Sequence, residues 1–158
     1  MSIERMVYTG TSYFGEYARK EIITEIKKRK YNKALVVTDA MLVQCGVAEK
    51  IENVLKDGGI SYEIDDEVKP NPTIDNVHTG LDKLKASGAD FIIAVGGGSV
   101  IDTAKAISLG SYYPGDVWDL YEQKAKATEV LPIGVVLTMA ATASEANGVS
   151  VIWNEEQN

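Results

Sequence analysis

The 158-residue chain has only one cysteine, Cys45, and one histidine, His78. A single cysteine cannot form an intrachain disulfide, which is the pattern of proteins in a reducing compartment. A metal site needs several converging ligands, and two such residues far apart in sequence do not suggest one. We therefore expect no metal site in this chain. His78 is expected on the solvated face of a helix.

Basic residues are outnumbered, and long apolar runs are missing. The chain carries 16 Lys and Arg against 23 Asp and Glu, which gives a formal net charge of −7. Nucleic acids and anionic membranes select basic surfaces, so neither is expected as a partner. No apolar stretch approaches the length of a membrane span or of a signal peptide core. These features predict a cytoplasmic protein with one domain over residues 1–158. The acidic run Asp65-Asp66-Glu67 is expected to be a solvated turn.

Buried strands alternate with amphipathic helices along most of the chain. The clearest strand patterns are the short apolar runs at 34–38, 91–95 and 133–138. Helical patterns lie between them. The helical pattern at 40–55 is interrupted at Gly46, where we expect a bend or a break. This alternation predicts a Rossmann-like α/β fold, an open parallel sheet with helices on both faces.

The two ends of the chain give weaker patterns. Residues 5–8 predict a short strand, and Gly10 and Gly15 bracket a turn-rich connection. Residues 149–153 predict an extended strand that leads into a turn at 154–156. A hairpin turn normally has a returning strand. We therefore expect that the domain is truncated at its C-terminal end.

Three glycines and a serine follow the strand at 91–95. In open α/β sheets, ligands bind at the carboxyl ends of the strands. Glycine lacks the Cβ that would keep the backbone from a pyrophosphate, and the helix behind it supplies free N–H groups. Gly97, Gly98 and Ser99 are therefore candidates for phosphate binding, and Ser99 with Asp102 is expected to form a capping box. The alternative is a tight turn without a ligand, because the run matches neither G-x-G-x-x-G nor a P-loop.

Two further strand ends carry polar side chains. Asp39 follows the strand at 34–38, where an acid can accept hydrogen bonds from an adenosine ribose and repel a 2′-phosphate. Asp39 can equally serve as the N-cap of a helix that begins at Ala40, and the spacing does not decide between these roles. Thr138 and Thr142 follow the strand at 133–138, and their hydroxyls can bond a ribose, adenine or phosphate. An ordinary loop explains this threonine-rich turn better by itself.

In this order, the motifs resemble the N-terminal domain of the iron-dependent (group III) alcohol dehydrogenases, whose fold is dehydroquinate synthase-like. The resemblance covers essentially the whole chain. Residues 1 to about 107 are similar to the lactaldehyde reductase branch, and residues from Leu131 onward are similar to the butanol dehydrogenase branch. The substrate is therefore left open. The matching pieces are Val36–Asp39, Pro70–Thr73, the glycine loop with Asp102 and Lys105, and Thr138–Glu145.

The resemblance implies a role for each matched residue. The glycine loop would hold the pyrophosphate, and Asp39 would sit at the adenosine ribose and favour NAD over NADP. Asp102 would lie near the nicotinamide, and Thr138 and Thr142 would line the adenine and ribose side. In the family, an aspartate and three histidines in a C-terminal helical domain hold the iron or zinc. None of those positions is in this chain, so we expect it to bind cofactor but to be inactive alone, with no catalytic residue of its own.

Two other functions stay open. The chain could be a non-catalytic remnant that acts through self-association, since a missing domain exposes apolar surface and an unpaired strand at 149–153. It could also be a relative of glycerol dehydrogenase or dehydroquinate synthase, which share the glycine loop. A homo-oligomer is expected, and a small alcohol or aldehyde would bind only with the missing domain.

Overall fold

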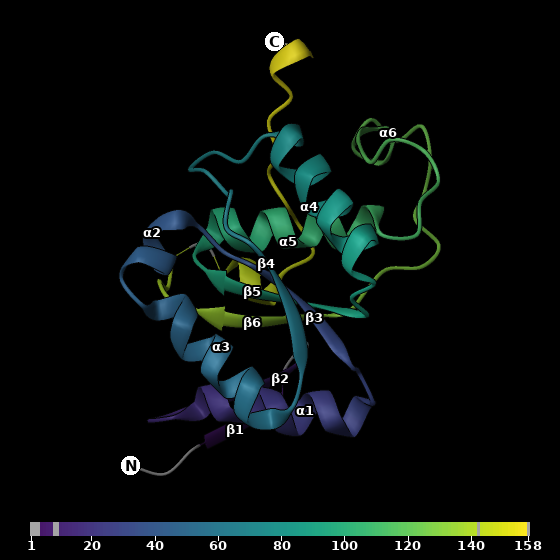
Figure 1. Cartoon of the computed structure of the whole chain (residues 1–158). Coiled ribbons are helices and arrows are strands. Elements are labelled where there is room, and N and C mark those ends of the chain that lie inside the picture. The colour runs from purple at the N-terminus through teal and green to yellow at the C-terminus, as the bar shows by residue number, and fades with distance from the viewer. Residues whose placement is uncertain (1–3, 8–9, 142, 158) are drawn as a thin grey trace.

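A computed structural model describes residues 4–7, 10–141 and 143–157 of the chain. Four parallel strands form the central sheet in the order β4-β3-β5-β6. Helices lie on both sides of this sheet (Figure 1). The predicted α/β fold is confirmed. The strands of the sheet are β3 (Lys33–Val37), β4 (Ser61–Asp65), β5 (Phe91–Gly96) and β6 (Ile133–Leu137).

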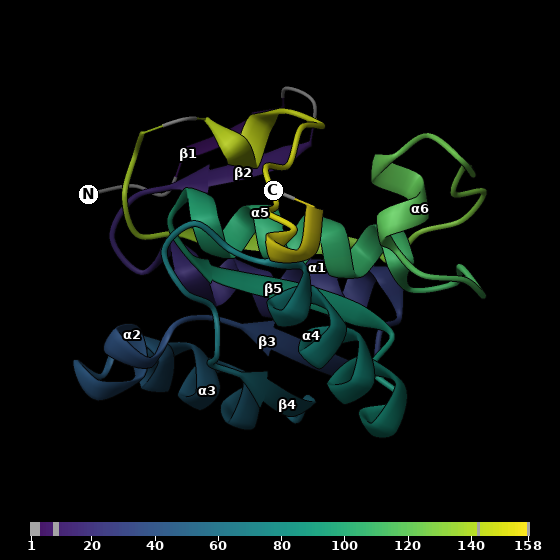
Figure 2. The ribbon, with the colours of Figure 1, turned by 90° about the horizontal axis from the view of Figure 1, so that it is seen from above.

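Two hydrophobic layers attach the helices to the sheet. The view from above shows how the helices are arranged around the strands (Figure 2). The helices α4 (Ile74–Ser87) and α5 (Gly98–Gly110) cover one face. The helices α1 (Glu21–Arg29) and α3 (Val47–Gly58) cover the other. Side chains alternate across a strand, so β3 and β5 contribute to both layers and read as continuous apolar runs. The strand residues in the first layer include Leu35, Val37, Ile92 and Ala94, and those in the second include Val36, Phe91, Ile93 and Val95.

Local sequence explains where several helices begin and end. The helical pattern at 40–55 is divided into α2 (Ala40–Gln44) and α3 at Gly46, whose φ of +76° is a conformation that L side chains rarely adopt. The expected interruption is therefore a true break. Thr73 precedes α4, and its amide donates to the Asn76 side chain at 3.2 Å. The short helix α6 (Trp118–Tyr121) is a single turn.

The two ends of the chain differ from the prediction. The strand β1 (Glu4–Val7) pairs with β2 (Thr11–Phe14) in an antiparallel hairpin, so the connection expected between Gly10 and Gly15 is itself a strand. The glycines suggested a turn, but they only flank the hairpin strand. Residues 149–153 do not form a regular strand. One isolated bridge joins Trp153 to Thr73, because this stretch is hydrogen-bonded mainly by side chains.

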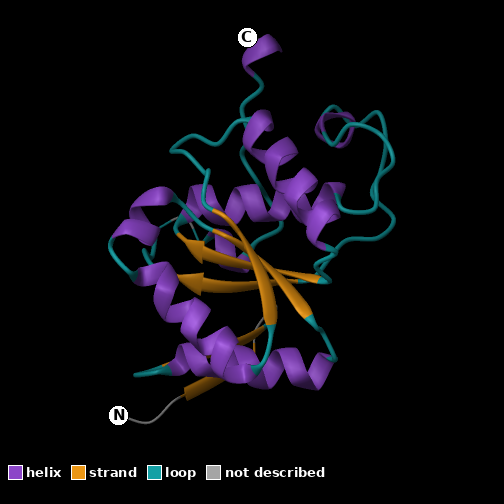
Figure 3. Cartoon of the chain, in the orientation of Figure 1, coloured by secondary structure: helices purple, strands orange, loops and turns teal. Residues whose placement is uncertain are grey.

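The strand order reverses between β3 and β5. The chain runs outward from β3 to β4, crosses back to β5 and continues to β6 on the other side. All four strands end at the same edge of the sheet (Figure 3). Such a reversal opens a crevice outside the carboxyl ends of the two central strands, which is where open α/β sheets bind ligands. Among the described helices, none is long and apolar enough to cross a membrane.

Candidate functional site

Asp39 follows β3 at the crevice and caps α2. Its backbone is extended, and its Oδ1 accepts a hydrogen bond from the Leu42 amide at 2.8 Å. The N-cap role, one of two left open by the sequence, is confirmed. The second carboxylate oxygen receives no hydrogen bond from any residue that the structure describes. Asp39 is half-buried, so this oxygen is available to a ligand in the crevice.

The glycines after β5 have different structural roles. A Cβ on Gly96 would lie 2.6 Å from Cγ2 of Val100, so Gly96 lets α5 approach β5 closely. Of the residues that the structure describes, a Cβ on Gly97 would meet only Cβ of Met139, at 3.8 Å, which is an ordinary contact. Packing therefore requires glycine at 96, whereas Gly97 leaves open space at the crevice.

The helix α5 begins without a side-chain cap. Its N-cap residue is Gly97, with φ −96° and ψ −162°, and among the described residues no side-chain capping bond is made to the helix. The predicted capping box of Ser99 and Asp102 is wrong, because the helix starts before Ser99 and places it inside the first turn. The first amides of a helix lack intrahelical partners and carry the positive end of its dipole. Gly98 and Ser99 therefore present N–H groups suited to an anion.

Thr138 lies at the same edge of the sheet, at the end of β6. It directly follows β6, and its amide donates to the carbonyl of Gly96 at 3.1 Å. Between the two central strands, β3 and β5, Thr38 Oγ1 donates to the carbonyl of Val95 at 2.9 Å. This bond keeps Asp39 beside residues 96–99, which we call the glycine turn. The structure thus brings Asp39, Gly97 to Ser99 and Thr138 to one edge of the sheet. Thr142 lies outside the described residues, so its role stays a prediction.

Asp102 lies further along α5, and its carboxylate already has protein partners. Its Oδ1 accepts from Ser144 Oγ at 2.6 Å, and its Oδ2 accepts from the Val151 amide at 3.1 Å. Lys105 is on the same helix face and also bonds Ser144, at 2.8 Å, while burial lowers the pKa of the Lys105 ammonium. These contacts were not predicted from the sequence. The spacing of Asp102 and Lys105 by three residues, which places both on one side of a helix, is the signal that could have indicated them.

Asp65 is at the end of β4, and the prediction that it lies in a solvated turn is wrong. Its side chain is buried, and Lys83 from α4 approaches its Oδ1 at 3.0 Å and Glu67 Oε1 at 2.8 Å. Burial raises the pKa of Asp65, and the Lys83 ammonium opposes this rise. Burial would lower the pKa of Lys83, but hydrogen bonds to Glu67 and Asp65 raise it instead. Asp65 can be buried at the end of β4 because the Lys83 ammonium on α4 pairs with its carboxylate.

His78 and Cys45 remain outside this edge. His78 lies on α4 with an exposed side chain, as expected, and its Nε2 is 3.2 Å from Asp116 Oδ1. Cys45 is exposed after α2. Within the described ranges, no cluster of three or more His, Cys, Asp or Glu side chains could hold a metal ion. The described residues therefore do not supply a donor set for iron.

Comparisons with known proteins identify the family of this chain. Residues 9–158 match the family model for iron-containing alcohol dehydrogenase. Lactaldehyde reductase from Escherichia coli (strain K12) is 43% identical over 155 residues, which are 97% of this chain and 41% of that protein. Probable NADH-dependent butanol dehydrogenase 2 from Bacillus subtilis (strain 168) is 40% identical over 146 residues, which are 92% of this chain and 37% of that protein.

A solved structure shows the same fold. NADH-dependent butanol dehydrogenase A from Thermotoga maritima superposes with a TM-score of 0.86 at 38% identity, over 90% of this chain and 36% of that one. Both branches suggested by the sequence motifs are among these relatives. The chain spans about two fifths of the length of the curated relatives it matches, at 41% and 37%.

Proposed function

Because the chain belongs to the iron-containing alcohol dehydrogenase family, we propose that residues 1–158 are the dinucleotide-binding domain of an enzyme that interconverts alcohols and aldehydes. One observation carries the proposal: the uncapped α5 N-terminus opens onto space left by Gly97 at the strand-order reversal. A pyrophosphate fits this place, because free amides and the helix dipole attract an anion. In this proposal, Gly97, Gly98 and Ser99 hold the pyrophosphate.

The cofactor in this proposal is NAD in preference to NADP. Asp39 has one carboxylate oxygen free of its capping bond, and this oxygen can accept a hydrogen bond from the adenosine ribose. A 2′-phosphate at the same place would be repelled by the carboxylate. Three of the curated relatives are named as NADH-dependent butanol dehydrogenases, two of them as probable ones, which supports this choice. Thr138 and Thr142 are proposed to line the adenine and ribose side.

The chain's own part in the reaction is to bind and orient the cofactor. When bound, the nicotinamide supplies the atom that accepts or donates hydride. The described residues offer no donor set for iron, so no catalytic step is assigned to them. We propose that the 158-residue chain alone binds cofactor without oxidising alcohols at a useful rate.

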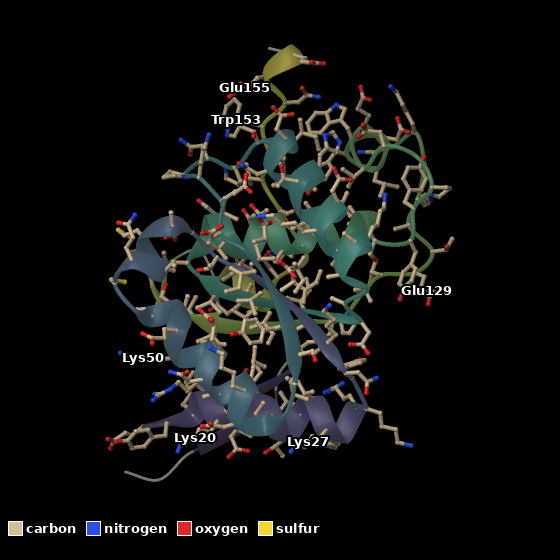
Figure 4. All side chains as sticks on the ribbon, viewed as in Figure 1. Lys20, Lys27, Lys50, Glu129, Trp153 and Glu155 are labelled. Carbon is tan, nitrogen blue, oxygen red and sulfur yellow. The ribbon has the colours of Figure 1, made fainter. Side chains whose placement is uncertain are left out.

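We also propose that the chain self-associates through residues 149–153. Val149, Val151 and Trp153 are 66%, 59% and 50% exposed, and Trp153 lies at the outer end of this stretch (Figure 4). The backbone groups of Ser150 and Ile152 make no hydrogen bond to any described residue, so one edge of the stretch is free. The occupant is a second copy. If two such stretches pair antiparallel about Val151, each Val151 faces the other and each Val149 faces Trp153, so apolar side chains meet on one face. Residues 149–153 carry no charge, so the two stretches do not repel each other.

Sedimentation velocity tests this association. Val151→Lys should shift the chain toward monomer, because two lysines would then face each other at the centre of the pair. Val130→Lys, at another exposed valine, is the matched control and should leave association unchanged. A wild-type chain that stays monomeric at high concentration would contradict the proposal, as would a Val151→Lys chain that associates like the wild type.

Calorimetric titration with NADH and then NADPH tests the proposed cofactor site. The folded chain should bind NADH, and NADPH should bind at least about tenfold more weakly, a difference of about 1.4 kcal/mol. An accompanying assay with added NAD⁺, Fe²⁺ and a short primary alcohol should show no NADH formation. A chain with a cooperative thermal transition that binds neither dinucleotide would overturn the assignment.

A further inference from the structure

The clearest feature that the proposed function leaves unused is a polar network on α5. It consists of Asp102, Lys105, Ser144 and Asn147, which we call the α5 clasp. The C-terminal segment runs across α5 in both views (Figures 1 and 2), and the clasp lies between the two. The network joins residues about forty positions apart, so it fixes one part of the chain against another.

Lys105 is the centre of the α5 clasp. Its Nζ donates to Ser144 Oγ at 2.8 Å, Asn147 Oδ1 at 3.1 Å and the Val149 carbonyl at 2.7 Å, and its side chain is 16% exposed. An ammonium has three N–H bonds, and all three are donated. Lys105 is therefore not free to act as a base, which argues for a role in holding the segment.

Asp102 holds the same segment at two further points. It accepts from Ser144 Oγ at 2.6 Å and from the Val151 amide at 3.1 Å, and it lies 3.9 Å from Lys105 Nζ. The Ser144 hydroxyl thus donates to an anion and accepts from a cation. Charge-assisted hydrogen bonds of this kind are stronger than neutral ones. Ser144 is buried, and the side chains of Lys105 and Asp102 are only 16% and 17% exposed. Both oxygens of Asp102 are engaged by the protein.

The α5 clasp also fixes the loop before it, which begins at Thr138. Asn147 Nδ2 donates to the Ala143 carbonyl at 2.9 Å. Ala143 has a φ of +53°, a left-handed conformation that is unfavourable for alanine and persists only where surrounding contacts hold it. At its other end, the loop is tied to Gly96 by the Thr138 amide. Met139, within this loop, is the nearest neighbour of a Cβ built on Gly97.

We propose that Lys105 and Asp102 are positioning residues of the dinucleotide site, which hold residues 143–151 against α5 and thereby fix residues 138–141 beside the glycine turn. This inference rests on the proposed function. It gives Asp102 an indirect role, through the loop, in place of contact with the nicotinamide. The loop lines the adenine and ribose side, so loosening it should weaken binding of the adenosine part of the cofactor and leave the nicotinamide part unaffected.

Hydrogen exchange and fragment binding test the proposal in the 158-residue chain. In Lys105→Met, the Val149 and Val151 amides should exchange at least about tenfold faster than in the wild type. Affinity for NADH and for ADP should fall by about tenfold each, while affinity for nicotinamide mononucleotide stays unchanged. Lys105→Arg keeps a charged donor and should restore most of the lost affinity. Lys50→Met removes an exposed lysine on α3 (Figure 4) and should change nothing.

The possible outcomes separate the two proposals. Unchanged exchange at Val149 and Val151 in Lys105→Met would overturn the α5 clasp. Faster exchange with unchanged NADH and ADP affinity would overturn its positioning role, as would an equal loss for nicotinamide mononucleotide. A wild-type chain that binds neither NADH nor ADP would overturn the proposed function and the positioning role, while exchange would still decide whether the clasp holds the segment. If Lys105→Met does not fold, Asn147→Ala removes the link to Ala143 and keeps Lys105.

Discussion

Two strand-to-helix turns lie side by side at the carboxyl edge of the sheet, and they are completed in opposite ways. After β3, Asp39 folds its carboxylate back onto the Leu42 amide and caps α2. After β5, Gly97 occupies the same N-cap position and leaves α5 without a side-chain cap. A capping side chain stabilises its helix and occupies the amides, whereas glycine forgoes that stability and leaves the amides to a ligand. The difference shows which turn is built for local stability and which for binding.

The largest effect on stability is expected at the end of β4, outside both of these turns. Lys83→Met leaves the buried carboxylate of Asp65 without its cation and should destabilise the fold by about 3 kcal/mol at pH 7. Urea unfolding measures this loss. Lys85→Met, at an exposed position of the same helix, is the control and should cost less than about 0.5 kcal/mol.

The loss in Lys83→Met should depend on pH with a defined sign. Burial raises the folded-state pKa of Asp65 above its ordinary value of 3.8. Between 3.8 and the raised pKa, the native state binds more protons than the unfolded chain, so ionisation of Asp65 lowers stability as pH rises through this window. Lys83 offsets that loss in the wild type. The deficit of Lys83→Met should therefore shrink as pH falls through the raised pKa of Asp65, and a deficit independent of pH would contradict the ion pair.

We call the turn after β5, at Gly97, the open turn and the turn after β3, at Asp39, the closed turn. Gly97→Asp gives the open turn a capping side chain like that of the closed turn. The added Cβ makes an ordinary contact with Cβ of Met139 at 3.8 Å, and aspartate is a favoured N-cap, so α5 should gain about 0.3 kcal/mol. The new carboxylate would compete for the amides and repel a pyrophosphate, so NADH affinity should fall by about 100-fold, or about 2.7 kcal/mol. Thermal unfolding should therefore show a slightly higher stability, whereas NADH titration should show a lower affinity. Gly10→Asp, at an exposed glycine with no atoms near its Cβ, is the control for added charge.

The smallest effect is expected from Asp39→Asn in the closed turn. Asparagine caps a helix about as well as aspartate, so stability should stay within about 0.5 kcal/mol of the wild type. The change removes the charge that disfavours a 2′-phosphate, so the preference for NADH over NADPH should fall by about fivefold. Competition titrations with both dinucleotides give this ratio. An unchanged preference would show that Asp39 only caps α2.

Sequence patterns predicted the elements that depend on local chemistry. The apolar runs of β3 and β5 and the break at Gly46 were predictable, because burial on both faces and a left-handed glycine leave local signatures. The run at 133–138 does contain the strand β6, but its prediction as a buried strand is wrong, because β6 lies at the edge of the sheet and is only half-buried. The α5 start was misplaced, since Ser99 and Asp102 have capping-box spacing but extended Gly97 takes the N-cap position.

Contacts between distant residues could not be predicted in this way. The burial of Asp65 depends on Lys83, which comes from another element, so the acidic run resembled a solvated turn. Residues 149–153 have the composition of a strand, but their partners are Asp102 and Lys105 on a helix. The strand ends of the candidate site were predicted, because parallel strands end at one edge. The side chains that hold its loop were not, because their partners lie about forty residues away.

Backbone amide NMR of the chain during titration with NADH tests the central claim most directly. If the open turn binds the pyrophosphate, the Gly98 and Ser99 amides should show the largest shifts, and Leu42, whose amide is capped by Asp39, should change little. NADH binding that leaves the Gly98 and Ser99 amides unshifted would contradict the account and place the cofactor elsewhere on the chain.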